Sequence, residues 1–446
     1  MPLARFVPLV VVACLLGGEA APVAQAPAAY PDPTVRVLTH REQNELVTPW
    51  IGKRFDTVLP GLMTREGIDM WIIPTREYNE DPVFASMSPL TYFASRRRTI
   101  LVFYNPGEGK PVERYSIGRF DYDKLYTMYP TSNDGQHEGL RKLVEEKQPK
   151  VIGINESDAW NHADGITANE KRRLLEALGP AYSGRVKSAE MLAVGWLEVK
   201  LPEELEAYRH AMKVAHMIIR EAFSNKVITP GKTTSQDVVW WMRQRVAELG
   251  LGSWFQPSIT IARKGGTPAT AQGVILPGDM LHTDFGIVYM GFSTDTQHNA
   301  YVLLPGETEA PQGLKDGLKK ANRLQDLTMQ FARLERTGNQ ALADTIGEAK
   351  KEDIIPSIYC HPVGYHGHAA GPPIGMTDYQ QGVPVRGDYV FRPNTWHSIE
   401  LNATHAVPEW DNLAVRFALE EDAALMPGGK WDWVDGRQTE FYLIKP

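Results

Sequence analysis

The stretch of sequence that decides the fold contains LHTDFG at residues 281–286 and STDT at residues 293–296. Its two aspartates, Asp284 and Asp295, are eleven positions apart. The segment between them predicts a hairpin that turns at Gly291, so two adjacent antiparallel strands would bring both carboxylates together. A carboxylate in an apolar strand is unfavourable unless it is paired or bound to a metal. Taken alone, the two aspartates are explained by unrelated turn or edge residues, and a functional site is the alternative that further residues have to support.

Histidines and glutamates follow downstream of the aspartates. The run YHGHAAG places His366 and His368 among glycines, with His361 shortly before them. Glycine-flanked histidines on a strand-like segment fit the close approach of backbone to a bound ion or substrate. Glu400 in SIELN and Glu420 in VRFALEED each lie on an expected strand, where the alternative is a solvated strand end.

The regions on either side of residue 197 differ in their patterns. Upstream, short apolar runs at 69–73, 99–103 and 151–154 predict buried strands, and 140–146 predicts a helix between them. Downstream, Pro202 suits the first turn of a long helix with one apolar stripe. A helix is expected over 235–249, and a helical segment over 314–349 interrupts a region dominated by strands.

The ordered set Asp, Asp, His, Glu, Glu resembles the pita-bread metallopeptidases. These are methionine aminopeptidase, Xaa-Pro aminopeptidase and prolidase, with creatinase as a metal-free relative. The likeness covers roughly residues 200–446 and includes Gly-His-x-x-Gly at 367–371. The earlier α/β region resembles the N-terminal domain of the proline-directed branch. The resemblance implies an α/β N-terminal domain over 35–197, creatinase/prolidase-like, followed by an α+β pita-bread catalytic domain over 198–446.

The resemblance also implies a centre with two divalent metal ions. Its ligands would be Asp284, Asp295, His368, Glu400 and Glu420. Asp284 would hold one ion, His368 and Glu400 the other, and Asp295 and Glu420 would bridge. Mixed oxygen and nitrogen ligands fit Mn, with Co or Zn as alternatives. Glu400 would in addition act as the catalytic carboxylate that carries a proton.

Two assignments within this set have competitors. His366 competes with His368 for the ligand position, and His368 is preferred because it fits the Gly-His-x-x-Gly pattern. His366 is then a candidate catalytic residue. Glu421 competes with Glu420, which is preferred as the first glutamate of the acidic cluster. Arg416 lies four residues before Glu420, whereas the family arginine usually lies two before its glutamate.

Substrate-binding histidines of the proline-directed branch are missing at the expected places. No histidine lies between His216 and His282, and position 375, seven residues after His368, is glycine. His282 lies on the same strand face as Asp284, so His282 or His366 would have to compensate. The alternative for His282 is a packed or supporting residue on the strand face.

The N-terminus reads as a secretory signal peptide over residues 1–20. Arg5 precedes an apolar run from Phe6 to Leu16, and small residues lead to an expected cleavage after Ala20. The run is shorter than the roughly 20 residues of a membrane-spanning helix. We therefore expect an exported protein, periplasmic or extracellular; a lipoprotein anchored at Cys14 is the less favoured alternative.

The composition sets limits on partners. The chain of 446 residues is 43% hydrophobic and 23% charged, which excludes a disordered or coiled-coil chain. Its net charge is -7 and its longest basic block is Arg96–Arg98, so we expect no nucleic-acid partner. Two cysteines make no disulfide framework. The expected partners are a small peptide substrate and, by resemblance, a second copy in a homodimer, with no membrane after signal cleavage.

Together these patterns predict a dinuclear-metal peptidase that releases an N-terminal residue from small peptides, as an Xaa-Pro aminopeptidase or a dipeptidase. Two alternatives stay open. A creatinase-like hydrolase of a C–N bond would need no metal, but all five ligand types are retained here. A non-catalytic binding protein would explain the missing substrate histidines. Metal content and hydrolysis of a peptide panel discriminate among the three.

Overall fold

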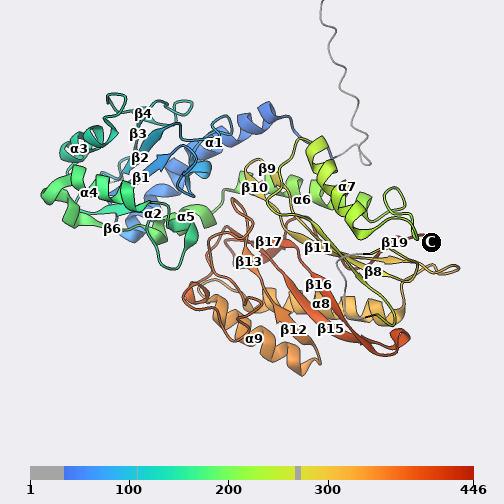
Figure 1. The fold of residues 1–446 in the computed structure, drawn as a ribbon. Helices are drawn as coiled ribbons and strands as arrows, with labels where there is room; N and C mark the ends of the chain where they lie inside the picture. The colour runs from blue at the N-terminus through green and yellow to red at the C-terminus, as the bar shows by residue number, and fades with distance from the viewer. Residues whose placement is uncertain (1–34, 108, 267–272) are drawn as a thin grey trace, which may run out of the picture.

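The computed structural model describes residues 35–107, 109–266 and 273–446. The expected signal peptide and Cys14 lie outside the described residues. The chain forms two parts that meet along one side (Figure 1). No helix among the described residues is long and apolar enough to cross a membrane.

The first part is a mixed six-stranded sheet with strand order β4-β3-β2-β1-β5-β6. Its strands are β1 (Met70–Arg76), β2 (Arg98–Tyr104), β3 (Glu113–Ile117), β4 (Thr127–Met128), β5 (Ile152–Ile154) and β6 (Val186–Ser188). Its helices are α1 (His40–Thr57), α2 (Leu59–Glu66), α3 (Gln136–Lys147), α4 (Ala168–Tyr182) and α5 (Glu190–Glu198). The predicted strands and helix of this α/β region are confirmed as β1, β2, β5 and α3.

Helices cover both faces of this sheet, which explains the continuous apolar runs of its central strands. Met70 and Ile72 of β1 belong to the hydrophobic cluster that contains residues of α3 and α4. Trp71 and Ile73 belong to the cluster on the opposite face, with residues of α1 and α5. Because alternate side chains of a strand point to opposite faces, one short apolar run supplies both clusters.

The second part is built from short, mostly antiparallel sheets between two pairs of helices (Figure 1). Its helices are α6 (Pro202–Ala222), α7 (Ser235–Glu248), α8 (Gln312–Phe331) and α9 (Gly338–Lys351). The strands around the hairpin are β7 (Ser258–Ala262), β8 (Met280–Phe285), β9 (Val288–Tyr289), β10 (Phe292–Ser293), β11 (Thr296–Val302) and β19 (Tyr442–Ile444). The remaining strands are β12 (Ile355–Ile358), β13 (His361–Pro362), β14 (Thr395–Ser398), β15 (Leu401–Val407), β16 (Leu413–Leu419), β17 (Asp422–Leu425) and β18 (Trp431–Trp433).

The long helix predicted from Pro202 is confirmed as α6. Its apolar stripe is buried, including Leu205, Tyr208, Met212 and Ile219. Glu204 accepts a hydrogen bond from the backbone N–H of Leu201, so a carboxylate stabilises the positive end of the helix.

The helical segment predicted over 314–349 is two helices, α8 and α9. The chain between them contains Glu335 with a φ of 64°, which a continuous helix does not accommodate. The Thr337 side chain accepts a hydrogen bond from the backbone N–H of Gln340 and caps the second helix. Sequence periodicity continued across the break because both helices bury one face in the same cluster.

Two further expectations about strands are wrong. Residues 365–371, expected to be strand-like, form an irregular loop after β13. Glu400 lies not within a strand but between β14 and β15. Both segments therefore lie outside regular strand pairing, next to the candidate site.

Buried polar contacts join the two parts of the molecule where the chain passes from α5 to α6. Arg54 of α1 is fully buried and donates hydrogen bonds to the carbonyl of Val199 at 2.5 Å and to Glu204 at 3.1 Å. The linker thus has a defined conformation. The domain boundary near residue 197 stays a prediction.

Candidate metal centre

The hairpin places the two aspartates as the sequence predicted. Met290 and Gly291 have φ values of 54° and 79°, as the two central residues of a tight hairpin turn require. The chain returns as β11, which pairs with β8 so that Gln297 lies opposite Asp284. Asp295 directly precedes β11. Both carboxylates therefore lie at the same end of the β8–β11 pair.

A second set of strands brings the downstream residues to the same place. His361 of β13 pairs with Ser398 of β14, two residues before Glu400. Glu420 follows β16, and its backbone forms a bridge with Gln297. Residues that are far apart in the sequence thus converge because β11 contacts the end of β16.

The imidazole of His361 lies between three carboxylates. Its Nε2 atom is 3.3 Å from Glu420 Oε1, 3.5 Å from Asp295 Oδ2 and 3.8 Å from Glu400 Oε2. Asp284, Asp295 and Glu420 form a neighbouring group whose oxygens lie within 4.8 Å of one another. The two groups share Glu420, so they resemble two adjacent metal positions.

The atoms of this centre fit a divalent cation. Nδ1 of His361 lies 3.0 Å from the Pro362 carbonyl, which only accepts, so Nδ1 carries a proton. A metal-binding histidine is commonly oriented in this way, with its other nitrogen facing the ion. Within the described residues, His361 Nε2, Asp284 Oδ1 and Asp295 Oδ1 are buried without a hydrogen-bond partner.

The electrostatics of the centre favour the same conclusion. Burial and the negative charge of Glu420 raise the pKa of Asp284 to about 8. The same two causes hold the pKa of Asp295 and of Glu400 well above the usual range. Burial alone would lower the pKa of His361, but Asp295 and Glu420 raise it well above its usual value. Crowded carboxylates therefore need either protons or a cation.

His368, the ligand predicted from the sequence, lies beside these carboxylates. Its ring centroid is 4.6 Å from that of His361, and it can join a group with His361 and Asp295. The side chain is nevertheless exposed, and no ion pair joins it to a carboxylate in the described part of the chain. His361 rather than His368 lies in ion-pair range of Asp295, Glu400 and Glu420. The role of His368 as a ligand stays a prediction.

The sequence contained a signal for His361. His361 and His368 are seven residues apart, which is the spacing that the resemblance gives for the ligand and the second histidine. With His361 as the ligand, His368 would take the place of the second histidine, which the match to Gly-His-x-x-Gly puts at Gly375.

His366, the predicted catalytic histidine, points toward the first part of the molecule. Its ring centroid is 4.6 Å from that of His162, which belongs to the α/β part. Burial, followed by the nearby His162 and Lys200, lowers the pKa of His366 to about 4. Its Nδ1 atom is buried without a partner among the described residues. Nothing in the sequence around His162 predicts this contact.

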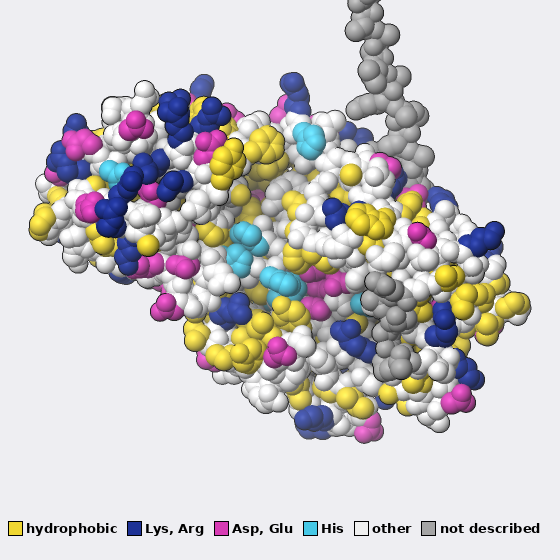
Figure 2. All heavy atoms as spheres, in the orientation of Figure 1, with side chains coloured by type: hydrophobic (Ala, Val, Ile, Leu, Met, Phe, Trp, Pro, Cys, Tyr) yellow, Lys and Arg dark blue, Asp and Glu magenta, His cyan; other side chains and the backbone are white. Residues whose placement is uncertain are grey.

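Histidines and acidic side chains are exposed together in the hollow between the two parts (Figure 2). One wall of the site includes Trp254, whose Nε1 donates a hydrogen bond to the carbonyl of Thr294 at 2.9 Å. The Trp254 ring packs 5.3 Å from that of His368. A side chain at Gly367 would come within 2.2 Å of this indole, so glycine permits the close approach.

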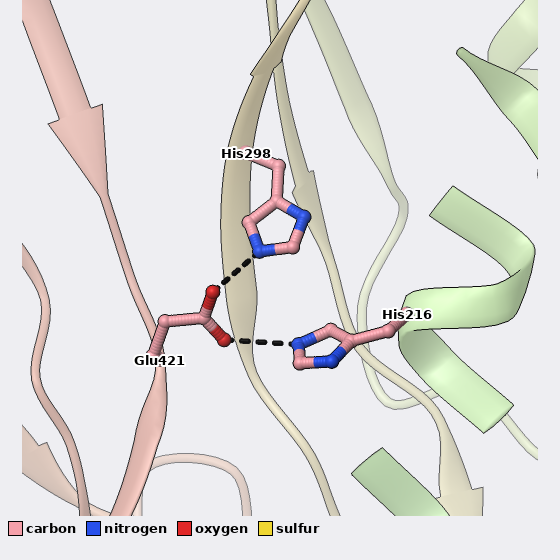
Figure 3. A group of neighbouring side chains, drawn as sticks. All are labelled: His216, His298 and Glu421. Carbon is pink, nitrogen blue, oxygen red and sulfur yellow. Dashed lines mark hydrogen bonds and ion pairs between the residues drawn. The ribbon is translucent and has the colours of Figure 1, made fainter. Parts of the chain in front are cut away.

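Glu421 faces a separate buried cluster, away from this centre (Figure 3). It accepts hydrogen bonds from Nε2 of His216 at 2.9 Å and from Nε2 of His298 at 2.5 Å. Asp435 lies 3.0 Å from the other nitrogen of His216. These distances are those of hydrogen bonds, so the group is satisfied without an ion. Glu420 rather than Glu421 therefore faces Asp284 and Asp295.

The charges of this second cluster compensate one another. Burial alone would raise the pKa of Glu421, but His298 and His216 lower it to about 2. Burial alone would lower the pKa of His216, but Glu421 and Asp435 raise it to about 9. The pKa of His298 is lowered, chiefly by burial. The cluster is therefore an ion pair in which His216 is the protonated partner.

Solved structures of several peptidases share this fold over most of their length. An X-Pro aminopeptidase from Thermotoga maritima superposes with a TM-score of 0.61 at 16% identity, covering 84% of this chain and 98% of that chain. A dipeptidase from Pyrococcus horikoshii gives a TM-score of 0.58 at 16% identity, with coverages of 89% and 100%. An Xaa-Pro dipeptidase from Bacillus anthracis gives 0.56 at 17% identity, with coverages of 91% and 100%.

The protein therefore has the pita-bread fold of these peptidases, with an α/β part before an α+β part, as the sequence predicted. No family model matches the sequence, and no curated protein matches it.

Proposed function

We propose that the protein is a dinuclear-metal-dependent peptidase that releases the N-terminal residue of small peptides, as an Xaa-Pro aminopeptidase or a dipeptidase. One observation supports this most: on a pita-bread fold, His361 Nε2 is buried without a hydrogen-bond partner, 3.3 to 3.8 Å from carboxylate oxygens of Asp295, Glu400 and Glu420. His361, Asp295, Glu400 and Glu420 would hold one ion. Asp284, Asp295 and Glu420 would hold the other.

Divalent ions bound there would polarise the scissile carbonyl and lower the pKa of a water, and Mn is our first choice. Glu400 is the carboxylate that moves the proton, because it lies at the edge of the centre and is less buried than Glu420. Its Oε2 atom faces His361 and its Oε1 atom is held by Gln297. These contacts fix the orientation of the carboxylate without covering it.

Neutral imidazoles on the route to the centre would bind the peptide. His366 and His368 both have a pKa lowered to about 4, so they are uncharged near neutral pH. Burial is the chief cause; for the partly exposed His368 burial is incomplete, and the charge of His361 lowers its pKa further. An uncharged imidazole can donate to a peptide carbonyl or accept from an amide. His162 of the α/β part lies beside His366, with ring centroids 4.6 Å apart, and could contact the same peptide.

Location and assembly are also proposals. We infer export to the periplasm or the exterior from the sequence of residues 1–20 alone. We infer a homodimer from the resemblance. A non-catalytic protein with the same fold is the second candidate, and His282 supports it because this histidine bonds to Gln297 rather than facing the site.

Metal analysis and a peptide panel test the proposal. The purified protein should bind two equivalents of Mn and hydrolyse Xaa-Pro or Xaa-Ala dipeptides and tripeptides. Asp295→Ala should lose most of the metal and all metal-dependent hydrolysis, because Asp295 belongs to both groups of ligands. Asp378→Ala, which changes an exposed aspartate, is the matched control. Full metal content and an unchanged rate in Asp295→Ala would exclude the dinuclear assignment.

A further inference from the structure

Gln297 is placed at the middle of the centre by backbone pairing alone. It lies opposite Asp284 in the β8–β11 register. Its backbone N–H donates to the Glu420 carbonyl at 3.1 Å, and the Glu420 N–H donates to the Gln297 carbonyl at 3.2 Å. The Gln297 side chain is 3% exposed. A neutral amide is therefore buried among four carboxylates.

The amide nitrogen of Gln297 bridges two of these carboxylates. Its Nε2 atom is 2.8 Å from Glu400 Oε1 and 2.8 Å from Glu420 Oε2. The NH2 group, and not the carbonyl oxygen, therefore faces both carboxylates, and each carboxylate oxygen accepts one of its hydrogen bonds. Both of its protons are then used.

A chain of side chains fixes this orientation. The Gln297 Oε1 atom is 2.9 Å from Nε2 of His282, which therefore donates to it. The other nitrogen of His282 is 3.4 Å from the hydroxyl of Thr260, its cross-strand partner in β7. Rotating the amide by half a turn would place its oxygen against the carboxylates and its NH2 group against an N–H. Thr260 thus orients His282, and His282 in turn orients the amide of Gln297.

The amide holds only the outer oxygens of the two glutamates. Glu400 Oε2 and Glu420 Oε1 face His361 Nε2. Ser398 donates to Glu420 Oε1 at 2.5 Å from the other side. In each glutamate, one carboxylate oxygen therefore faces His361, and the other is hydrogen-bonded to Gln297.

We propose that Gln297, oriented by His282 and Thr260, is a positioning residue that holds Glu420 Oε2 and competes with the second ion for this oxygen. If Glu420 held two ions through its two oxygens, Oε1 would serve the ion at His361 and Oε2 would serve the ion at Asp284. That oxygen is the one that Gln297 holds. This inference rests on the metal centre of the proposed function and assigns a role to a residue outside its ligand set.

Titration of the metal-free protein with Mn²⁺ alone tests this role. Calorimetry gives the two affinities, and electron paramagnetic resonance reports whether two bound Mn²⁺ ions are spin-coupled. Gln297→Met keeps the length of the side chain and removes the donor. It should tighten the second ion by about tenfold, the value of a hydrogen bond to a charged group, and leave the first within about threefold. His282→Phe removes the donor that orients the amide and should shift the second ion in the same direction, by less.

Ser398→Ala is the matched control, because it removes a donor from the same carboxylate but from Oε1. It should change the first affinity and not the second. Suppose that the wild type binds both Mn²⁺ ions with equal affinity and that neither Gln297→Met nor His282→Phe alters these affinities. This result would overturn the role of Gln297 and leave the metal centre intact. No Mn²⁺ binding by the folded wild type would overturn the proposed function itself, and with it this inference.

Discussion

The imidazole of His361 faces the carboxylate of Glu420 across 3.3 Å, measured from Nε2 to Oε1. Since Nδ1 of His361 already donates to the Pro362 carbonyl, the neutral ring would direct a lone pair at a carboxylate. Such an arrangement is stable only with a proton or a cation between the two groups. This contact defines the centre more sharply than the aspartate pair, because it fixes which nitrogen is available.

The first prediction separates His361 from His368. His361→Ala should lower Mn affinity by at least tenfold, because loss of this ring removes the imidazole nitrogen that faces Asp295, Glu400 and Glu420. His368→Ala should keep the metal, because its exposed side chain makes no ion pair with them. Metal content after dialysis measures both. Depletion in His368→Ala with retention in His361→Ala would restore the assignment made from the sequence.

The second prediction concerns stability and pH at His216. The pKa of this histidine is raised to about 9, because Glu421 and Asp435 outweigh the effect of burial. A raised pKa contributes stability that is fully present below about 6.5 and is lost as the pH rises through about 9. His216→Gln should therefore lower the free energy of unfolding by about 3 kcal/mol at pH 6. The deficit should shrink steadily between pH 6.5 and 9.

Urea denaturation at several pH values measures this difference. His40→Gln, at an exposed histidine, is the control and should show no such dependence. A deficit that grows from pH 6 to 9 would show that His216 is neutral in the folded protein. His298 and Tyr442, which also line the cluster, would then need a different hydrogen-bonding pattern.

The third prediction concerns the contact between the two parts of the molecule. His162→Ala and His366→Ala should both keep the metal, since neither side chain belongs to the groups of potential ligands found in the described part of the chain. We expect KM for tripeptides to rise by about tenfold, the value of one or two lost hydrogen bonds, with a smaller change in kcat. Steady-state kinetics on matched dipeptides and tripeptides measure the effect. Unchanged KM in both variants would place the peptide elsewhere.

Much of the fold could be predicted from local patterns. Apolar periodicity was sufficient to predict the strands β1, β2 and β5 and the helix α6. The apolar residues of these patterns are the ones that are buried in the fold. Asp284 and Asp295 were found because one short hairpin, closed by Gly291, joins their strands. These features depend on neighbours in the sequence.

The rest depended on contacts between distant segments. His361 lies on a strand of two residues, and its orientation comes from pairing with β14 far downstream. Gln297 carries no charge and belongs to no motif, so only its pairing with Asp284 and Glu420 reveals it. His162 reaches the site from the other part of the molecule. No local pattern carries these relationships.

The last prediction tests whether the protein is an enzyme. Glu400→Gln keeps the shape of the side chain and an oxygen that can accept from Gln297, but it cannot carry a proton. If Glu400 transfers the proton, turnover should fall by at least ~10²-fold, the lower end for loss of general acid–base catalysis. Metal content should fall only in part, because His361, Asp295 and Glu420 remain. Glu45→Gln, at an exposed glutamate, should match the wild type. If both the wild type and Glu400→Gln bind metal but cleave no peptide in the panel, the binding-protein alternative is favoured. If Glu400→Gln retains wild-type turnover, the proton is carried by another group. His366 is then the next to test, because Glu421 is already engaged by His216 and His298.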